Sequence, residues 1–455
     1  MELLFTKQKD WEKNSPCLCG KAHKSQTKHI LITADGISKL QQLLEGLPYK
    51  KILVVSDVNT EAAVGKEVKQ HLHKESFCSL VFSDSDLIPN EISIEKFMIE
   101  AQGKDLILAI GSGTINDLAR FISFTKQIPY MIFCTAPSMD GYGSSVSPLL
   151  LNGLKTTVEA QVPLAIIGDL KVLQEAPYHM IIAGFGDLVG KYTCLMDWKM
   201  SHIFHGEYYC EEITGLTRES VNQAVKQIQS IAERERVGIE KLQESLILSG
   251  IAMSYVGNSR PASGGEHHLS HFWEMMFLFQ NKPPVLHGIK VGVATLLILR
   301  LYEYLWKEKI DWDSIKSHIT DFNMENYEQI MKNVFGKASK EIVQEEKKIQ
   351  RYAKESREKR IMLYQQKWDI FIRETQWHIP SYHQAEEWLL ALGHPVTPKD
   401  LGIEADLLYA SLLYAKEIRS RFTILQLLDD LGLLEKYARQ LVFEIYEVKP
   451  TWSGI

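Results

Sequence analysis

The sequence lacks a hydrophobic run long enough to span a membrane. A spanning helix needs about 18 or more consecutive apolar residues. The longest candidate here, 291–306, is interrupted by Arg300 and Glu303. The first residues, 1–7, do not join a charged region to an apolar one and so do not resemble a signal peptide. We therefore expect a cytoplasmic protein with no membrane span.

Cysteine is scarce as well, with six residues scattered among 455. This scatter argues against a disulfide framework and favours a reducing compartment. Only Cys17 and Cys19 lie close together, and His23 follows them. Two thiols and an imidazole could hold zinc, but CxC lacks the usual CxxC spacing and no second Cys/His pair lies nearby. We expect a surface loop near the N-terminus here, with a structural metal site as the alternative.

Excess positive charge is also missing. The net charge is −6, so no overall basic surface favours nucleic acid or an anionic membrane. A hydrophobic content of 45% and a charged content of 24% are ordinary for a globular chain, and 455 residues suffice for two or three domains. The densely charged segment 337–359 carries both signs, and we expect it to form a solvated helix.

Short apolar runs alternate with helical patterns up to about residue 170, which is typical of right-handed βαβ units and a parallel sheet. Beyond Pro177 a 3.6-residue periodicity dominates and runs rich in β-branched residues become few. We predict an α/β, Rossmann-like, nucleotide-binding domain over 1–177 and an all-α domain over 178–455. Strands are expected at 51–56, 105–111 and 130–134, and helices at 61–74, 94–102, 221–233, 239–256, 289–306 and 405–418.

The segment Gly111-Ser-Gly113-Thr-Ile-Asn116-Asp117 follows one of the predicted strands and opens a predicted helix. Glycines let the backbone approach a diphosphate, and the helix start offers N–H groups and a positive dipole end. The dinucleotide fingerprint G-x-G-x-x-G is not met, because Asn116 replaces the third glycine. The Gly-Lys-Ser/Thr phosphate loop is absent too. Alone, this segment suits nucleotide binding and an ordinary strand-to-helix turn equally well.

Two other segments favour a nucleotide. Asp57 follows the strand expected at 51–56, where an acid could bind a ribose diol, although it could also cap a helix. The loop 135–141, Thr-Ala-Pro-Ser-Met-Asp-Gly, follows the strand expected at 130–134. Strand carboxyl ends form the usual ligand edge of an open α/β sheet.

Three histidines fall within residues 267–271, and His287 follows. In a helix His267 and His271 would lie one turn apart on the same face. A metal site is favoured over a chance cluster on a polar helix face. A catalytic metal needs about three protein ligands, and Asp187, behind two glycines, offers a carboxylate to join His267 and His287. Asp187 could equally cap the helix that follows it.

Four segments occur here in the order seen in one family: TAPSMDG, GFGDLVGKYT, SRPASGGEHHLSH and LHGIKVG. In these the chain resembles the sn-glycerol-1-phosphate dehydrogenases, most closely the bacterial AraM-like branch. That family belongs to the superfamily of iron-type alcohol dehydrogenases, glycerol dehydrogenases and dehydroquinate synthases. The resemblance covers roughly residues 50–295. It implies the dehydroquinate synthase-like arrangement of the two domains.

The resemblance also implies roles for particular residues. One divalent metal would be held by Asp187, His267 and His287. His271 would lie beside the substrate as a catalytic residue, and Asp140 would contact substrate. The residues expected to meet NAD(H) or NADP(H) are Asp57 at the adenosine ribose, Gly113, Thr114, Ile115, Asn116 and Asp117 at the diphosphate, and Thr135, Ala136, Pro137, Ser138 and Ser144 toward the nicotinamide.

The implied reaction reduces dihydroxyacetone phosphate to sn-glycerol 1-phosphate, with NADH slightly favoured because the Asp57 carboxylate would repel a 2′-phosphate. Nickel is implied by the resemblance and zinc also suits the ligands. A homodimer is implied as well. The phosphate-binding residues stay open, with Lys155, Lys191 and Arg260 as candidates by charge. The alternatives are a glycerol or other polyol dehydrogenase, a dehydroquinate synthase-like lyase, a two-His, one-carboxylate oxygenase or hydrolase, and a non-catalytic nucleotide-binding protein.

Overall fold

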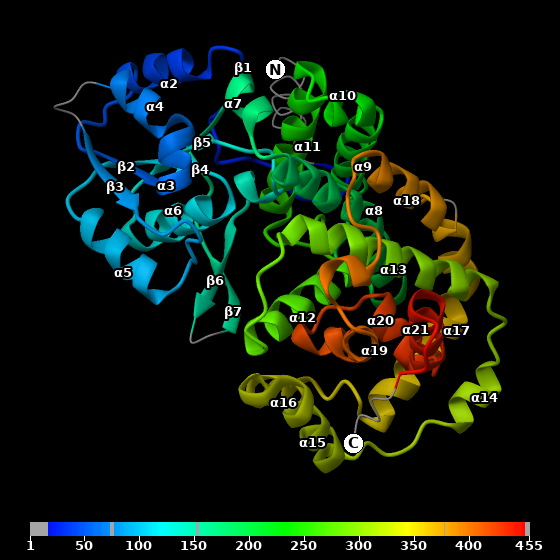
Figure 1. The fold of residues 1–455 in the computed structure, drawn as a ribbon. Helices are drawn as coiled ribbons and strands as arrows, with labels where there is room; N and C mark the ends of the chain where they lie inside the picture. The colour runs from blue at the N-terminus through cyan, green and yellow to red at the C-terminus, as the bar shows by residue number, and fades with distance from the viewer. Residues whose placement is uncertain (1–16, 73–76, 152–153, 377, 451–455) are drawn as a thin grey trace. The chain divides into compact units, whose positions relative to one another are not determined.

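The computed structural model describes residues 17–72, 77–151, 154–376 and 378–450 (Figure 1). Its residues cluster into two compact units. Unit 1 comprises residues up to Leu188, Cys210–Ala262 and Ala391–Gly393, and unit 2 comprises Val189–Tyr209, Ser263–Leu390 and the residues from His394 onward. The predicted boundary at 177/178 stays a prediction. A linear pattern does not reveal that residues 210–262 group with the sheet.

Unit 1 contains a six-stranded parallel sheet in the order β1-β8-β5-β4-β2-β3, and a separate antiparallel hairpin of β6 and β7. The predicted α/β class is confirmed, as are the strands near 51–56, 105–111 and 130–134. Sequence reasoning did not identify the other strands. The strands are β1 (His29–Thr33), β2 (Ile52–Asp57), β3 (Phe77–Phe82), β4 (Leu106–Gly111), β5 (Tyr130–Cys134), β6 (Val146–Leu151), β7 (Leu154–Glu159) and β8 (Ala165–Asp169).

Helices cover both faces of this sheet, so strands β4, β5 and β8 are buried along their whole length. Alternate residues such as Val54, Leu108 and Phe133 pack with Leu40 of α2 and Val68 of α4. The helical elements of unit 1 are α2 (Gly36–Glu45), α3 (Val58–Thr60), η1 (Glu61–Gly65), α4 (Lys66–Gln70), α5 (Glu91–Glu100), α6 (Gly113–Lys126), η3 (Gly141–Gly143), α7 (Leu170–Glu175), the first part of α8 (Tyr178–His205), α9 (Glu211–Val225), α10 (Ile228–Ala232) and α11 (Arg236–Val256).

The described residues of unit 2 form helices and the loops that join them, with no strand, which confirms the predicted helical character of this part of the chain. The segment 337–359 is not one helix, because Gln350 is left-handed at φ 50° and ends α16 before α17 begins. Its helices are the second part of α8, α12 (Gly265–Phe279), α13 (His287–Lys307), α14 (Trp312–Ser317), α15 (Met324–Phe335), η4 (Gly336–Ala338), α16 (Ser339–Ile349), α17 (Lys354–Thr375), α18 (Tyr382–Ala391), η5 (Pro398–Leu401), α19 (Ala405–Tyr414), η6 (Ala415–Ile418), α20 (Ile424–Asp430) and α21 (Leu434–Tyr446).

Among the helices that the structure describes, no candidate membrane span is found.

Two glycines let helices of unit 1 approach the loop after β5. A Cβ on Gly184 of α8 would lie 1.9 Å from the carbonyl oxygen of Pro137. A Cβ on Gly250 of α11 would lie 2.7 Å from the backbone nitrogen of Gly143 and 2.8 Å from the carbonyl oxygen of Asp140. These atoms belong to the backbone and cannot turn away as a side chain would. Both helices therefore hold the loop that carries Asp140.

We predict that Gly250→Ala lowers the free energy of unfolding by about 1–3 kcal/mol, since the added methyl group overpacks backbone against backbone. The matched control is Gly215→Ala in the middle of α9, where a Cβ meets nothing within 4 Å. This control should gain up to about 1 kcal/mol from helix propensity. Urea denaturation of both variants checks the prediction, and equal effects of the two substitutions would contradict it.

Candidate functional site

The carboxyl ends of β2 and β4 lie side by side in unit 1. Val55 pairs with Ala109, and the same register continued by two residues places Asp57 opposite Gly111. From β2 the chain runs outward to β3 and then returns to β4 on the other side of β2, so the strand order reverses at this point. Open α/β sheets bind ligands at such a reversal. The structure therefore brings Asp57 and the glycine segment to one ligand edge.

Asp57 is a helix cap in this structure. Its Oδ1 accepts the backbone N–H groups of Asn59 and Thr60, at 2.9 and 2.8 Å. The Thr60 hydroxyl oxygen in turn accepts the Asp57 N–H at 3.0 Å, which completes a capping box. Both reported caps use one carboxylate oxygen, so capping and ribose binding at this residue are compatible.

The glycine segment has two parts: Gly113 and Thr114 are half-buried, while Ile115 and Asn116 are buried. Gly113 and Thr114 lie in the first turn of α6, where N–H groups have no partner within the helix. Ile115 is buried, and Gly111 packs against it. Asn116 is fully buried, and its amide carbonyl oxygen accepts the Tyr130 hydroxyl at 3.3 Å. Asn116 therefore has a structural role in this structure. Its contact with a diphosphate stays a prediction.

The remaining predicted cofactor residues cluster around the end of β5. Asp117 lies 3.6 Å from the guanidinium of the buried Arg120. The described residues Thr135, Ala136, Pro137, Ser138 and Ser144 are all buried. The Thr135 N–H donates to the Gly111 carbonyl at 3.1 Å, so the loop joins the glycine segment. Unit 1 thus gathers these predicted residues, but their contact with NAD(P) stays a prediction.

Asp140 and Asp187 meet within unit 1. The backbone N–H of Asp140 donates to Oδ2 of Asp187 at 3.1 Å, and the Ser249 hydroxyl donates to Oδ2 of Asp140 at 3.0 Å. Asp187 is fully buried and lies inside α8, which begins at Tyr178. It therefore does not cap the helix that follows, and its role as a metal ligand stays a prediction.

Unit 2 brings the predicted histidines together. His267 and His271 lie on α12, and His287 begins α13. The ring centroids of His267 and His287 are 5.2 Å apart, and the centroid of His271 lies 6.1 and 5.4 Å from them. His268 is fully buried on the same helix. The prediction that His267 and His271 lie one turn apart on a helix is confirmed.

A buried carboxylate that sequence reasoning missed orients His267. Glu266 is completely buried, and its Oε1 lies 2.8 Å from Nδ1 of His267. The same oxygen accepts the Gly264 N–H at 2.6 Å, while the Thr193 hydroxyl donates to Oε2 at 2.7 Å. Burial raises the pKa of Glu266. With Nδ1 engaged by Glu266, Nε2 is the nitrogen suited to bind a metal, as in carboxylate–histidine–metal sites.

A second carboxylate missed by sequence reasoning, Glu274 of α12, joins the other two histidines. Its Oε2 lies 3.0 Å from Nδ1 of His271, and its Oε1 lies 3.3 Å from Nδ1 of His287. The Lys290 ammonium lies 2.9 Å from Oε1 as well. His287 therefore has the same carboxylate–imidazole arrangement as His267. The sequence did contain a signal for this contact, because Glu274 follows His271 by three residues, about one helical turn.

His271 differs from the other two rings in what meets Nε2. The Arg419 guanidinium lies 3.3 Å from this nitrogen, and Arg419 also donates to the Ser263 hydroxyl at 3.4 Å. Burial lowers the pKa of Arg419 while Glu274 raises it. Donor atoms of His271, Glu274 and His287 lie within 4.8 Å of one another and could hold a metal. The cations Lys290 and Arg419 beside this group disfavour a metal ion there.

Of the other cations considered by charge, Lys191 acts on the histidine site, because burial raises the pKa of Glu266 and the charge of Lys191 opposes this rise. Lys191 and Arg260 are buried, in unit 2 and unit 1 respectively, and the side chain of Lys155 lies outside the described part of the structure. Arg419 was not identified from the sequence, because it lies 148 residues after His271 without a local motif.

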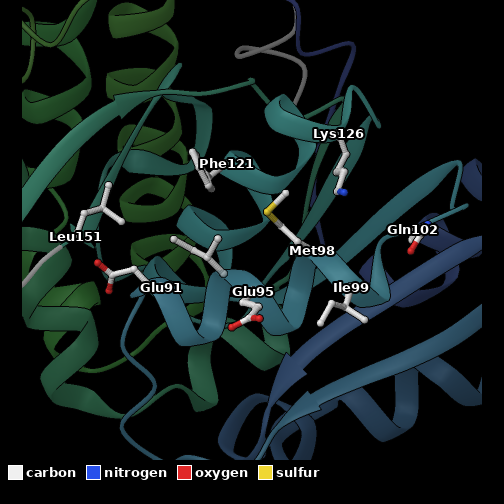
Figure 2. Close-up of a pocket in the computed structure, with 9 residues that line it drawn as sticks. Glu91, Glu95, Met98, Ile99, Gln102, Phe121, Lys126 and Leu151 are labelled. Atoms are coloured by element: carbon white, nitrogen blue, oxygen red, sulfur yellow. The ribbon is translucent and has the colours of Figure 1, made fainter.

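A surface groove of about 420 Å³ lies between α5 and α6 in unit 1. Figure 2 shows side chains such as Met98, Phe121 and Leu151 around it. None of the predicted site residues lines this groove, so it has no place in the site.

The fold resembles that of solved structures in one class of enzymes. A family model described as iron-containing alcohol dehydrogenase matches residues 31–177. Glycerol dehydrogenase from Schizosaccharomyces pombe has a similar structure, with a TM-score of 0.59 and 15% identity over 92% of this chain and 91% of that one. NADH-dependent butanol dehydrogenase A from Thermotoga maritima gives a TM-score of 0.58 and 13% identity over 91% and 97%. The fold is therefore that of the iron-containing alcohol dehydrogenases.

Two relatives narrow this class. A glycerol-1-phosphate dehydrogenase [NAD(P)+] from Bacillus licheniformis is 33% identical over 92% of this chain and 93% of its own length. Another, from Geobacillus thermodenitrificans, is 36% identical over 90% and 94%. The chain belongs to the glycerol-1-phosphate dehydrogenases, which are oxidoreductases.

A further buried carboxylate, Asp197 of α8, anchors the start of α12 in unit 2. Its Oδ2 accepts the Gly265 N–H at 2.7 Å, and its Oδ1 accepts the Ile424 N–H at 2.9 Å and the Tyr302 hydroxyl at 2.6 Å. Burial, and then the charge of Glu266, raise the pKa of Asp197 to about 7. The folded state therefore holds the Asp197 proton more tightly than the unfolded chain.

We predict that this titration makes the protein less stable as the pH rises from about 4 to about 7, since the charged form is disfavoured only in the folded state. Asp197→Asn should lower stability by about 1–3 kcal/mol at pH 5, because an amide cannot accept all three donors. The deficit should shrink at pH 8. Urea denaturation at both pH values checks this, and a deficit that grows with pH would contradict it.

Proposed function

We propose that the chain catalyses the NAD(P)H-linked, metal-dependent reduction of dihydroxyacetone phosphate to sn-glycerol 1-phosphate. The relatives support the activity and the glycerol phosphate substrate. The observation that carries metal dependence is the pair of carboxylate–imidazole contacts, Glu266 with His267 and Glu274 with His287. Each contact engages Nδ1 and so directs Nε2 to act as a ligand.

We propose Asp187, His267 and His287 as the ligands of one divalent ion, as the family segments in the sequence imply. Two imidazoles and one carboxylate suit nickel, zinc, iron or cobalt. Asp187 lies on the same helix as Thr193, which donates to Glu266. The helix α8 thus connects the carboxylate to the residues that orient His267.

When bound, the metal supplies a Lewis acid for the C2 carbonyl oxygen and the nicotinamide supplies the hydride. His271 then has the task of passing a proton to that oxygen, since an imidazole titrates near neutral pH. Glu274 holds the opposite ring nitrogen of His271 and so fixes its orientation. Asp140, held by Ser249, contacts the substrate. Asp57 and residues 113–117 bind the adenosine and the diphosphate.

We predict that His267→Ala and His287→Ala each abolish metal retention and turnover, because each removes a ligand. His271→Ala should keep the metal and lose about 10²–10⁴-fold in kcat, the usual contribution of a general acid. His318→Ala, at an exposed position, is the control. Metal analysis together with steady-state kinetics tests these assignments, and we expect the bound metal to be nickel. Light scattering of the same sample is expected to show a homodimer. Loss of metal from His271→Ala equal to that from His267→Ala would contradict the ligand assignment.

Arg419 is our proposed phosphate-binding residue. Its guanidinium lies beside His271, and Lys290 is a second cation around the same Glu274. A guanidinium fork matches the geometry of a phosphate. A phosphate-specific role also separates this function from that of a general polyol dehydrogenase.

We predict that Arg419→Gln raises KM for glycerol 1-phosphate by about 10–100-fold, the value of a lost charged hydrogen bond. Arg419→Lys should fall between it and the wild type. Arg439→Gln, which removes an exposed arginine paired with Glu435, is the control. The steady-state oxidation of glycerol 1-phosphate checks this, with free glycerol as the comparison substrate. A KM unchanged in Arg419→Gln would contradict the assignment.

A further inference from the structure

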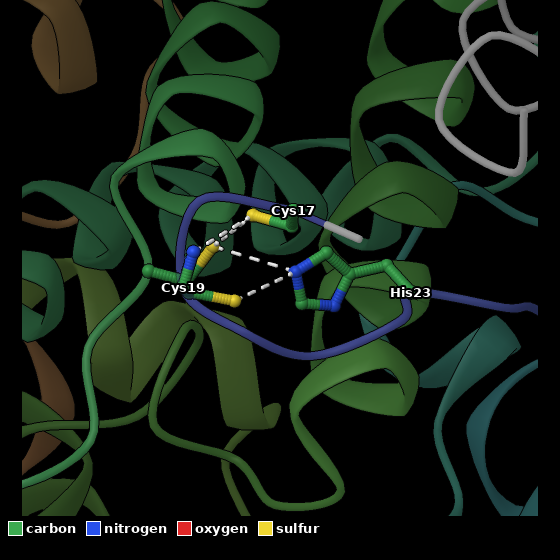
Figure 3. A group of neighbouring side chains, drawn as sticks. Cys17, Cys19 and His23 are labelled. Carbon is green, nitrogen blue, oxygen red and sulfur yellow. Dashed lines mark hydrogen bonds between the residues drawn. The ribbon is translucent and has the colours of Figure 1, made fainter. Parts of the chain in front are cut away.

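Four side chains that the proposed reaction does not use meet within unit 1. They are Cys17, Cys19, His23 and Cys210, and one donor atom from each lies within 4.8 Å of the others. Figure 3 shows the Cys17, Cys19 and His23 side chains pointing toward one another. Cys210 comes from the segment before α9, 187 positions after His23. The fold therefore supplies the fourth donor that the local sequence lacked.

Three distances between donor atoms match those of a tetrahedral zinc site. Zinc bonds of about 2.3 Å to sulfur and about 2.0 Å to nitrogen, at tetrahedral angles, imply S···S separations of about 3.8 Å and S···N separations of about 3.5 Å. The Cys17 and Cys210 sulfurs are 3.6 Å apart. The His23 Nε2 lies 3.3 Å from the Cys19 sulfur and 3.5 Å from the Cys210 sulfur.

The backbone explains how a CxC spacing can serve. The chain turns at Cys17–Gly20, where the Gly20 N–H donates to the Cys17 carbonyl at 2.8 Å and Gly20 has φ +81°. The Cys19 N–H approaches the Cys17 sulfur at 3.5 Å. This turn directs both sulfurs inward while Leu18 between them is 99% exposed. Only a glycine adopts such a φ without strain.

Three of the four donor side chains are buried, and Cys19 is half-buried. Cys17 is 7% exposed, His23 is 3% exposed and Cys210 is 1% exposed. The expected loop near the N-terminus is confirmed, with exposed residues such as Leu18 and Lys21, but the side chains of Cys17 and His23 are buried. All six cysteines of the chain are thiols here. A disulfide between Cys17 and Cys210 would need about 2.05 Å between sulfurs and would leave the convergence of Cys19 and His23 unexplained.

We propose that Cys17, Cys19, His23 and Cys210 bind one structural zinc ion, separate from the catalytic metal. Three thiolates and an imidazole make a closed coordination sphere, which is typical of structural sites. The ion joins the segment that leads into β1 to the start of α9. The His23 ring also packs on Tyr255 of α11, with centroids 5.8 Å apart. Zinc thereby fixes the N-terminal segment of unit 1 to two of its helices.

The test measures metal in protein purified from medium containing zinc. Cys210→Ser should lose one equivalent of zinc per chain, and Cys78→Ser, a thiol outside the group, should lose none. His267→Ala should keep the structural zinc, so a failure of the catalytic-metal proposal is distinguishable from a failure here. Equal zinc content in Cys210→Ser and the wild type overturns the proposal.

Cobalt substitution reads the ligands directly. Cobalt in the full-length protein should give thiolate-to-metal charge-transfer absorption that His267→Ala preserves and Cys19→Ser weakens or abolishes. Cys19→His, which restores a zinc donor, should regain a full equivalent of zinc, and this rescue separates ligation from misfolding. A Cys17–Cys210 disulfide in unreduced protein without bound zinc overturns the proposal, as does a failure of Cys19→His to bind more zinc than Cys19→Ser.

Discussion

The hydrogen bond between Glu266 and His267 is the interaction on which the rest of the site depends. Glu266 is buried, and three donors surround it: the Gly264 N–H, the Thr193 hydroxyl and the imidazole itself. A carboxylate in such a place is tolerable only because each oxygen is satisfied. The consequence is a histidine whose Nδ1 is committed and whose Nε2 direction is fixed before any ion binds.

The two glycines before Glu266 allow α12 to pack closely on α8. A Cβ on Gly264 would lie 2.7 Å from an Asp197 oxygen and 2.8 Å from the Cys194 Cα of α8. Close packing of α12 on α8 therefore requires a residue without a side chain. This close packing also lets the Gly265 N–H donate to Asp197. The motif SGGEHH thus encodes a tight helix contact next to His267, the proposed metal ligand.

Much of this arrangement could be predicted from the sequence. The strands at β2, β4 and β5 were recoverable because apolar runs of that length, followed by glycine or polar loops, have few other structures. The grouping of His267 with His271 followed from helical spacing. Glu266 lies within the motif SRPASGGEHHLSH and Glu274 lies three residues after it. Their orienting role depends on which ring nitrogen each one meets, and sequence spacing does not contain that information.

Other parts of the site could not be predicted, for a different reason. Arg419 and Cys210 reach their partners through tertiary packing, from positions 148 and 187 residues away in the chain. No periodicity or local spacing connects such residues. Asp57 shows the opposite case, since capping and ligand binding use the same residue type at the same strand end, and the structure displays the cap.

The proposed function requires oriented histidines, a bound metal and a nucleotide to act together on a phosphorylated triose. The most direct measurement is the NAD(P)+-dependent oxidation of sn-glycerol 1-phosphate against its 3-phosphate enantiomer, with and without metal removal from the same sample. We expect oxidation of the 1-phosphate alone, and we expect this activity to be lost on metal removal and restored when the ion is added back. Oxidation of both enantiomers at similar rates, or full activity without metal, would contradict it.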